Sequence, residues 1–477
     1  MTVAASSRFA GAAGDAWARV HSEILDVAGQ APEQAERSLQ RRARDLLAYH
    51  VRHGLNPAYR DLIERAGIDV TDHSDPVAAW QRVPVIDKQW LANAGYHRQP
   101  ACTGPTLVVS TSGSTAAQVL VPVTEECANR GLGDNFLRAL AMSGVGPRHR
   151  HWGIEHRPPG QDQDHGQGHG HGHSVTGSSI SMTWLARHCG ANALVTAATD
   201  PLEEQLRKAA DFQPETISGS PGFLQQIARL GGTLRPPLRP ALLVYGGAAL
   251  ADSDAERLRA GFPGVRLTAF YPTTDAGAIG VSPADDGVYL TFSETHLVEV
   301  LDDDGRPVAK GSRGDVAVTQ FDALAAPIIR YRVGDRATFL GWEKGRLLLS
   351  GIERAAEATI GSTLVPYSDL RTWAPRLAVL DNSVVAVQLV RAYSPIEQRE
   401  QPVVRVIAAR SPGLAEAALA LLDDLPQITA EVASGELAPA RVEFRDPPPT
   451  LDGHWKIPLY VDERDNAEQE ATPCPSD

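Results

Sequence analysis

A run of six small hydroxyl or glycine residues is the part of this sequence with the clearest capacity for chemistry. The run lies between two β-branched stretches and consists of Ser110, Thr111, Ser112, Gly113, Ser114 and Thr115. Several hydroxyl donors and unobstructed backbone N–H groups in a small space can enclose a phosphate group. Composition alone also permits an ordinary Ser/Thr hairpin turn. The sequence has neither the GxxxxGKS/T signature nor a strand–GxGxxG–helix pattern, which disfavours mononucleotide kinases and Rossmann dehydrogenases.

Four further blocks follow this loop, and each has a structural interpretation as well as a chemical one. The blocks are Tyr245–Leu250, Phe270–Gly277, Ile329–Asp335 and Asp452–Pro458. Taken singly, Gly246–Gly247 is a turn after a strand, Tyr271–Asp275 is a rigid turn beside a carboxylate, and Asp335 is a common turn residue. Lys456 by itself is a solvated surface charge. Single blocks therefore assign no function.

Composition and charge limit the class of protein. The 477 residues include 45 Lys and Arg against 58 Asp and Glu, a net charge of −13. Because phosphate backbones bind basic surfaces, this balance argues against a nucleic-acid-binding protein. No stretch of about 18 apolar residues is present, so no membrane-spanning helix is expected. The absence of a signal-peptide pattern and of any CxxC pair among four cysteines predicts a reducing, cytoplasmic location.

The spacing of apolar residues predicts an α/β protein with two domains. Residues 15–100 form a mainly helical start, and from about 105 short β-branched runs alternate with helices. Residues 286–350 contain strand-like pieces separated by tight turns. We therefore expect a large N-terminal domain of layered α/β sheets over 1–350, which includes the β-rich part. A smaller C-terminal α+β domain over 351–465 and a disordered tail over 466–477 complete the prediction.

Histidines gather in one low-complexity stretch. Residues 161–173 read QDQDHGQGHGHGH, a composition that can bind zinc or nickel loosely but also fits a flexible surface loop. His149, His151 and His156 precede the stretch, and they either are solvated or line the mouth of a substrate pocket. Neither a GxSxG nor an HExxH pattern is present, so serine-hydrolase and zincin chemistry are not supported.

In their order and spacing, the hydroxyl loop and the four blocks resemble the core motifs of the adenylate-forming (ANL) superfamily, which includes acyl-CoA synthetases, adenylation domains and luciferases. Within it the chain is similar to the phenylacetate–CoA ligase-like branch. Further similarities to that branch lie in Tyr59–Leu62, Ala66–Ile68, Val83–Lys88 and Phe212–Pro221. The resemblance covers nearly the whole chain and implies an enzyme whose C-terminal domain is mobile.

The resemblance implies that several blocks meet at an ATP and Mg²⁺ site. The loop over Ser110–Thr115 would close over the ATP phosphates. Tyr271 would stack on adenine, Thr274 would hydrogen-bond the α-phosphate, and Asp275 would hold Mg²⁺. Asp335 would accept both ribose hydroxyls through its two oxygens.

The remaining motif residues would contact the nucleotide or act on the acid. Gly246 and Gly247 would let the backbone approach the adenine and the acyl group, since no Cβ intervenes. Lys456 would contact the carboxylate and the α-phosphate and stabilise the charge that develops during adenylation. The other residues that the resemblance assigns to the nucleotide are Ala248, Pro272 and Thr273.

The chain departs from the family pattern at three places. In the second half of the loop, the usual Gly, Pro and Lys are replaced by Ala116, Gln118 and Val119. The lost lysine is expected to reduce ATP affinity or turnover. Asp275 replaces a glutamate that is one methylene longer. In the hinge segment Ile352 stands at a usual arginine and Arg354 at a usual aspartate, which bears on the second half-reaction.

The leading hypothesis is an ATP- and Mg²⁺-dependent ligase that activates an aryl or small acyl carboxylic acid to an acyl-adenylate. The acyl group would pass to the thiol of CoA or of a carrier protein, or, given the altered hinge, to an amine. Because the nucleophile is the acid's own carboxylate, the protein's task is positioning and charge neutralisation. The second hypothesis is a catalytically degenerate scaffold that binds nucleotide or metal. A homodimer is the default expectation, and neither nucleic acid nor a membrane is expected as a partner.

Overall fold

The computed structural model divides the chain into two compact units. One contains Met1–Leu250 and Ala255–Ile352, and the other contains Ala251–Asp254 and Glu353–Asp477. The sequence placed the domain boundary at 350; the mobility of the second domain stays a prediction, and the predicted tail lies outside the described residues. The structure describes residues 3–53, 55–69, 76–101, 106–110, 119–147, 149–155, 192–197, 200–232, 234–247, 250, 252–273, 275–354, 357–360, 363–397, 399–408, 413–446 and 459–463.

Helices form the start of the first unit. They are α1 (Val3–Ala28), α2 (Pro32–His53), α3 (Pro57–Arg65), α4 (Pro76–Gln81) and α5 (Lys88–Ala94). The first helix begins well before the predicted position 15. Its first turns are mostly Ala, Ser and Gly, which show little apolar periodicity although alanine is the best helix former. Among the described residues, no helix is both long and apolar enough to cross a membrane.

Capping side chains set the starts of the shorter N-terminal helices. Asn56 accepts a hydrogen bond from the backbone N–H of Ala58 at the start of α3. Asp87 accepts one from the backbone N–H of Trp90 at the start of α5, over 2.7 Å. Each cap satisfies a backbone donor that the helix itself cannot pair, which ends the preceding segment at a defined residue.

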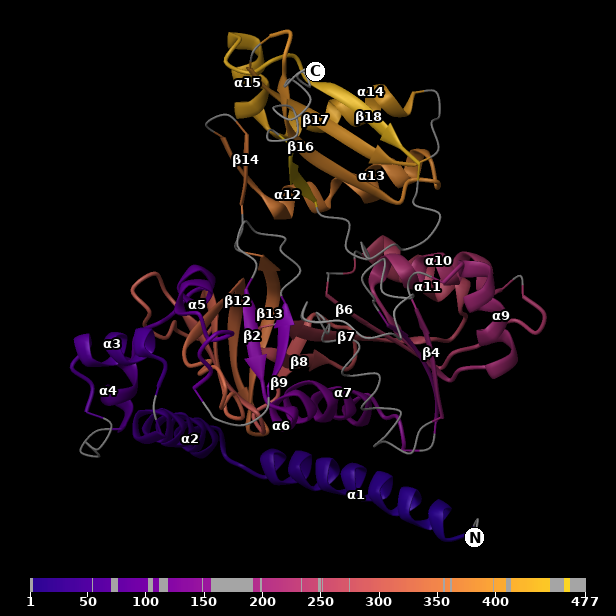
Figure 1. Cartoon of the computed structure of the whole chain (residues 1–477). Helices are drawn as coiled ribbons and strands as arrows, with labels where there is room; N and C mark the ends of the chain where they lie inside the picture. The colour runs from indigo at the N-terminus through magenta and orange to yellow at the C-terminus, as the bar shows by residue number, and fades with distance from the viewer. Residues whose placement is uncertain are drawn as a thin grey trace, which may run out of the picture. The chain divides into compact units, whose positions relative to one another are not determined.

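A mixed sheet forms the centre of the first unit (Figure 1). Among the described residues it has eleven strands in the order β10-β11-β12-β13-β9-β8-β7-β6-β5-β3-β4. Its strands are β3 (Arg150–Glu155), β4 (Asn192–Ala197), β5 (Thr216–Gly219), β6 (Leu242–Gly246), β7 (Arg266–Thr273), β8 (Gly277–Ser282), β9 (Val288–Thr291), β10 (His296–Leu301), β11 (Arg313–Gln320), β12 (Tyr331–Glu343) and β13 (Arg346–Arg354). A separate antiparallel hairpin pairs β1 (Leu107–Ser110) with β2 (Leu120–Val123).

The sheet changes from parallel to antiparallel at β7. The strands from β4 to β7 pair in parallel, and β8 returns antiparallel against β7 and β9. The register between β7 and β8 shifts at Tyr271 and Pro272, where a bulge accommodates a proline that cannot donate to the ladder. The predicted α/β fold is confirmed, and the β-rich part continues the parallel half in one hydrogen-bonded sheet.

Further helices follow β2 and the parallel strands along the chain. They are α6 (Glu125–Ala128), the π-helix η1 (Asn129–Asp134), α7 (Asn135–Met142), α9 (Leu202–Phe212), α10 (Pro221–Gly231) and α11 (Asp252–Gly261). The sheet contacts α10 through β5 and β6, α9 through β4, and α7 through β8. The long helix α1 packs on α7 (Figure 1) through Val20, Phe136 and Leu140.

One apolar core joins the N-terminal helices to the strands that carry the predicted motifs. It contains Leu46 and Tyr59 from the helices, Val121 from β2, and Tyr271 and Tyr331 from β7 and β12. These residues lie far apart in the sequence, and burying them together removes their apolar surface from water. Three motif-bearing segments are therefore held in one place by hydrophobic burial.

The second unit is a smaller α+β body. Its elements are β14 (Glu357–Ile360), β15 (Thr363–Pro366), α12 (Tyr367–Arg371), α13 (Trp373–Leu380), β16 (Ala386–Ser394), β17 (Arg399–Ile407), α14 (Leu414–Leu419), the 3₁₀ helix η2 (Ala420–Asp424), α15 (Pro426–Ser434), β18 (Arg441–Arg445) and β19 (Tyr460–Asp462). A four-stranded sheet has the order β18-β17-β16-β19. Trp373, Leu389, Val404 and Ile428 pack in its core, which is separate from the core of the first unit.

A buried ionic network ties α7 to α1 and to the sheet. Arg138 of α7 is 0% exposed, and it pairs with Glu23 of α1 and with Glu294. The Glu294 carboxylate also accepts two hydrogen bonds from Arg346 of β13. Burial by itself raises the pKa of Glu294, but the guanidinium groups of Arg346 and Arg138 outweigh burial and lower it below the ordinary value. The network is stable only while the carboxylate and both guanidinium groups are present.

Replacing Glu294 with alanine is expected to destabilise the first unit by about 3–5 kcal/mol, because two buried guanidinium groups lose their shared carboxylate. The midpoint of urea unfolding measures the effect. Lys208→Ala is the control, since Lys208 pairs with Glu204 at the exposed surface of α9, and its midpoint should equal that of the unaltered chain. An unchanged midpoint for Glu294→Ala would contradict the stabilising role of the network.

Candidate active site

Two crossed hydrogen bonds connect the end of β7 to the start of β12. The Tyr271 hydroxyl donates to Oδ2 of Asp335 over 2.7 Å, and the Tyr331 hydroxyl donates to Oδ2 of Asp275. All four side chains are buried, with exposed fractions of 9% or less. A hydrogen bond to a carboxylate in such a place is stronger than one at the surface. Two of the predicted blocks are therefore joined by two separate tyrosine–carboxylate pairs.

The Gly246–Gly247 block lies beside the end of β7. Gly246 is the last residue of β6 and pairs in parallel with Phe270. A Cβ at Gly246 would lie 2.9 Å from the carbonyl oxygen of Phe270 and 3.3 Å from Cδ of Pro272, so the neighbouring strand already requires glycine there. Gly247 has a φ of +80°, which also favours glycine. Both blocks follow the carboxyl ends of adjacent parallel strands, the edge at which α/β sheets bind ligands.

The turn that carries Asp275 is held by a small hydrogen-bond network. The Thr273 hydroxyl accepts from the N–H of Ala276 over 3.1 Å and donates to the carbonyl of Gly277 over 3.2 Å. The carbonyl of Ala276 accepts from Nε2 of His296 over 2.7 Å. Gly277 has a φ of +71°, and a Cβ there would lie 3.0 Å from the carbonyl oxygen of Gly131. The backbone around Asp275 is therefore fixed from several sides.

His296 supports this turn as a neutral imidazole. Its Nε2 donates to a carbonyl, and its Nδ1 accepts from the Thr295 hydroxyl over 2.9 Å. Burial lowers the pKa of His296 to about 4, because no water is available to solvate a charged ring. Asn135 adds to the network by donating to the carbonyl of Ala278 over 2.8 Å. The support of the turn thus depends on one tautomer of one histidine.

Part of the predicted site lies outside the described residues. This holds for Thr111, Ser112, Gly113, Ser114, Thr115, Ala248, Thr274 and Lys456. The backbone of Ser110 is described as the last residue of β1, opposite Leu120. The described residues therefore bring together Gly246, Gly247, Tyr271–Thr273, Asp275 and Asp335, while the phosphate loop and the lysine stay predictions.

A magnesium ion bound together with a nucleotide fits the residues around Asp275. Among the described residues there is no group of three or more His, Cys, Asp or Glu side chains that could hold a metal by itself. Mg²⁺ commonly takes only one or two carboxylates and completes its shell with substrate phosphates and water. A single buried carboxylate with a fixed orientation is compatible with that pattern. The histidine-rich stretch 161–173 lies outside the described residues.

Sequence reasoning did not assign a role to several residues of this site. Tyr331 belongs to a motif block, but nothing in a single sequence indicates that its hydroxyl reaches a carboxylate 56 positions earlier. Tyr289 packs edge-to-face against Tyr271, with 6.1 Å between the ring centroids, and burial raises its pKa to about 12. His296 follows a turn and resembles any strand histidine. Only the pairing of distant strands identifies these residues.

His149 and His151 are buried at the parallel half of the sheet. Nε2 of His151 hydrogen-bonds the Ser218 hydroxyl over 2.9 Å, and Nδ1 of His149 donates to the carbonyl of Gly146 over 2.9 Å. Burial lowers the pKa of His151 to about 3 and also lowers that of His149. Of the two alternatives for these histidines, solvation is therefore wrong for His149 and His151, and a place at the mouth of a substrate pocket stays a prediction. His156 lies outside the described residues.

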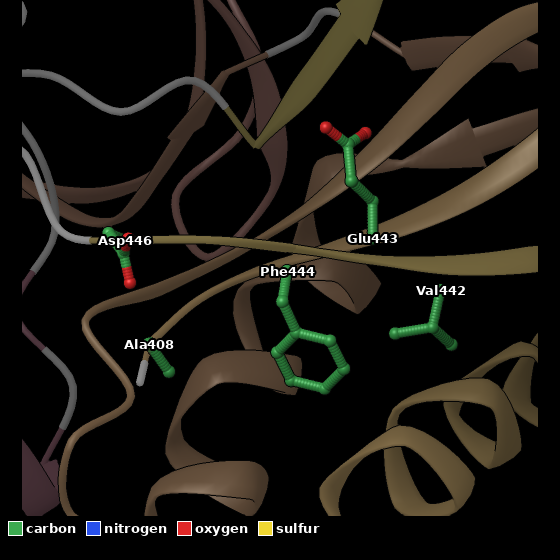
Figure 2. A pocket seen from close by; sticks show the side chains of 5 residues that line it. All are labelled: Ala408, Val442, Glu443, Phe444 and Asp446. Carbon is green, nitrogen blue, oxygen red and sulfur yellow. The ribbon is translucent and has the colours of Figure 1, made fainter. Parts of the chain in front are cut away.

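The second unit has a recess of about 410 Å³ beside β18 (Figure 2). It is lined by Ala408, Val442, Glu443, Phe444 and Asp446. Glu443 and Phe444 point to opposite sides of the strand (Figure 2), and the Glu443 carboxylate accepts hydrogen bonds from Arg405 and Arg445. Of the predicted site residues that the structure describes, none lines the recess.

The chain is similar in sequence to a known ligase. No family model matches the chain. A curated phenylacetate-coenzyme A ligase from Thermus thermophilus is 27% identical over 328 residues, which are 65% of this chain and 67% of that protein. The similarity is the one that the motif order predicts.

Solved structures of a 2-hydroxyisobutyryl-CoA ligase share the fold of the chain. Its postadenylation state with 2-HIB-AMP is 17% identical, covers 93% of this chain and 94% of that chain, and has a TM-score of 0.65. Its thioesterification state with 2-HIB-AMP and CoA is 18% identical over the same shares, with a TM-score of 0.58. An open conformation is 18% identical over 90% of this chain and 91% of that chain, with a TM-score of 0.55.

Replacing His296 with glutamine is expected to reduce the loss of stability in acid. In the folded chain His296 stays neutral down to about pH 4, whereas in the unfolded chain it takes a proton near pH 6.5. Stability therefore rises with pH between these values, by about 1.4 kcal/mol per pH unit for one proton. Glutamine offers a donor and an acceptor but does not titrate.

Urea unfolding at several pH values between 4.5 and 7 measures the slope, with intervals of about half a unit. His53→Gln, at an exposed histidine of α2, is the matched control and should keep the slope of the unaltered chain. A slope for His296→Gln as steep as that of the control would show that His296 does not titrate in this way.

Proposed function

We propose that this chain belongs to the adenylate-forming superfamily, on the basis of its fold and its similarity to a phenylacetate-coenzyme A ligase. In this proposal the chain activates a carboxylic acid with ATP and transfers the acyl group. The observation that carries the proposal is the pair of crossed bonds from Tyr271 to Asp335 and from Tyr331 to Asp275. They join the two blocks to which the resemblance assigns adenine, ribose and the metal.

In the first half-reaction the carboxylate of the acid attacks the α-phosphorus of ATP, an acyl-adenylate forms, and pyrophosphate leaves. Tyr271 stacks on the adenine and Asp335 accepts the ribose hydroxyls. Asp335 already accepts the Tyr271 hydroxyl through Oδ2, and because a carboxylate can accept about four hydrogen bonds, the two roles are compatible. Holding the nucleotide in this orientation lowers the activation barrier of adenylation, because binding has already positioned the reacting groups.

Charge neutralisation is the second task of the site. We assign the Thr274 hydroxyl and the Lys456 ammonium to the α-phosphate, where they stabilise the charge that develops during attack. Thr111–Thr115 enclose the remaining phosphates through hydroxyl and N–H donors. Asp275 would hold Mg²⁺, which neutralises phosphate charge when bound. The lysine replaced by Val119 is absent from this set, so the chain relies more strongly on these groups.

A thiol, of CoA or of a carrier protein, is the proposed acceptor of the acyl group. The curated relative is a coenzyme A ligase by name, which supports this choice and also an aryl or small acyl acid. An amine is the alternative acceptor, since Ile352 and Arg354 replace the usual hinge residues. A catalytically degenerate scaffold is the further alternative, and the replaced lysine and hinge residues are the features that favour it.

We also propose a cellular compartment and an oligomeric state for the protein. Four cysteines without a CxxC pair favour a reducing compartment, so we place the reaction in the cytoplasm. A homodimer remains the default oligomeric state.

Exchange of labelled pyrophosphate into ATP tests the first half-reaction. A panel of aryl and short acyl acids, including phenylacetate and 2-hydroxyisobutyrate, is expected to contain at least one acid that supports exchange. Asp275→Ala should lower the exchange rate by about a hundredfold, because the site loses the carboxylate that would hold the Mg²⁺ needed to neutralise phosphate charge. Asp304→Ala, at an exposed turn, is the control and should leave it unchanged. Exchange with no acid would favour the scaffold, and an unchanged exchange rate in Asp275→Ala would contradict the role assigned to Asp275.

Release of AMP with different acceptors tests the second half-reaction. With the acid found above, CoA is expected to raise the rate of AMP release at least about tenfold and to yield an acyl-CoA that mass spectrometry detects. The thiol sulfur attacks the acyl carbon, the thioester forms, and AMP leaves. AMP release that depends on an amine, with CoA inert, would instead establish the amide-forming alternative.

A further inference from the structure

Tyr331 makes a contact in the proposed site that the motif resemblance does not assign. Its side chain is 0% exposed, and its hydroxyl donates to Oδ2 of the buried Asp275 carboxylate. We infer that Tyr331 is a positioning residue that fixes the orientation of the Asp275 carboxylate toward a divalent cation bound with the nucleotide. The inference rests on the proposed function and names a residue that acts on the cation through Asp275.

The backbone of Tyr331 is held on both sides. Within the sheet it pairs with Val318 of β11, and on the other side it forms a parallel bridge with Ile86. Ile86 donates to the carbonyl of Arg330 over 3.1 Å and accepts from the N–H of Arg332 over 2.8 Å. A residue paired on two sides has little freedom to shift, so the position of its hydroxyl is set before any ligand binds.

The residue before Tyr331 is held in a left-handed conformation. Arg330 has a φ of +49°, which is costly for a residue with a long side chain. Its guanidinium donates to the carbonyls of Val83 over 2.7 Å and Gly305 over 2.8 Å, and to Glu299 over 3.3 Å. Such strain persists only where surrounding contacts determine the conformation. Here the contacts hold the turn that directs Tyr331 toward Asp275.

The chemistry of the cation explains why this orientation matters. Mg²⁺ requires near-ideal octahedral geometry and gives up its water ligands reluctantly. A carboxylate free to rotate about its last torsion would present its oxygens in many directions. A hydrogen bond to Oδ2 restricts that rotation and directs Oδ1, and the rigid turn formed by Thr273 and Gly277 fixes the backbone below it. The hydrogen bond from Tyr331 and the rigid turn therefore fix the orientation of the Asp275 carboxylate before a cation binds.

The other crossed pair provides an internal comparison. The Tyr271 hydroxyl donates to Asp335, the residue assigned to the ribose. Removing the Tyr271 hydroxyl should therefore affect binding of the nucleoside part, whereas removing the Tyr331 hydroxyl should affect only the contribution of the cation. Both changes delete one oxygen from a buried tyrosine in the same core, so a general loss of packing would affect them alike.

Calorimetric titration of ATP with and without Mg²⁺, in the absence of any acid, tests the inference. The Mg²⁺-dependent gain in ATP affinity should fall about tenfold in Tyr331→Phe, the lower end for losing a hydrogen bond to a charged group. AMP affinity measured without Mg²⁺ should be unchanged. Tyr271→Phe should show the reverse pattern. Tyr59→Phe, at a buried tyrosine whose hydroxyl has no partner within the described residues, is the matched control and should change neither quantity.

A double-mutant cycle separates positioning from stability. Asp275→Asn should itself abolish most of the Mg²⁺-dependent gain, and adding Tyr331→Phe to it should cause no further loss, because the hydroxyl acts through the carboxylate. A purely structural role would instead give additive losses. Melting temperatures of all variants, measured without ligand, identify any variant that does not fold. If Tyr331→Phe does not fold, Tyr331→His replaces it in the experiment. The imidazole ring keeps a hydrogen-bond donor, so Tyr331→His should retain part of the Mg²⁺-dependent gain.

The outcomes distinguish this inference from the function on which it rests. If the unaltered chain binds neither AMP nor ATP, the proposed function fails and the inference fails with it. If the unaltered chain shows a Mg²⁺-dependent gain that Tyr331→Phe retains, or if Tyr331→Phe and Tyr271→Phe lose AMP affinity equally, the inference alone is overturned.

Discussion

The candidate site depends on two hydroxyl–carboxylate bonds that cross between the end of β7 and the start of β12. Tyr271 and Asp275 are four residues apart on one segment, and Tyr331 and Asp335 are four residues apart on the other. Each tyrosine donates to the carboxylate of the opposite segment. Because a buried carboxylate is costly without donors, the two segments stabilise each other's charged residues. The same contacts fix the direction of both carboxylates.

The rest of the first unit follows the same constraint. Arg138, Arg330 and Arg346 are buried, and each has a carboxylate and backbone or side-chain oxygens as partners. His296 avoids the free-energy cost of a buried charge in another way, because it stays neutral and hydrogen-bonds through both ring nitrogens. These groups connect α1, α7 and the antiparallel strands to the turn at Asp275. Burial of polar groups with matched partners makes that turn rigid, and a rigid turn is what a preorganised site requires.

The predictions that succeeded came from patterns that a single segment contains. Alternating apolar strands and helices indicate an α/β fold, and the order of five short motifs indicates a similarity to phenylacetate–CoA ligases, which the comparison with curated proteins also found. The early start of α1 was missed because Ala, Ser and Gly carry little periodicity. The solvated alternative for His149 and His151 was wrong because their own segment does not reveal that His151 packs against Phe136 of α7 and that His149 hydrogen-bonds the carbonyl of Gly146. The sequence of one segment does not show which residues lie beside it across a sheet.

The amino-acid sequence by itself determined the class of fold, the candidate carboxylates Asp275 and Asp335, and the tyrosine Tyr271 beside them, since local pattern and motif order depend only on residues close along the chain. Tertiary structure alone decided which hydroxyl meets which carboxylate. Tyr331 and Asp275 are 56 positions apart, and their contact depends on where β12 enters the sheet and on the left-handed turn at Arg330. Strand order and backbone strain arise from packing of the whole unit, so no single segment contains them.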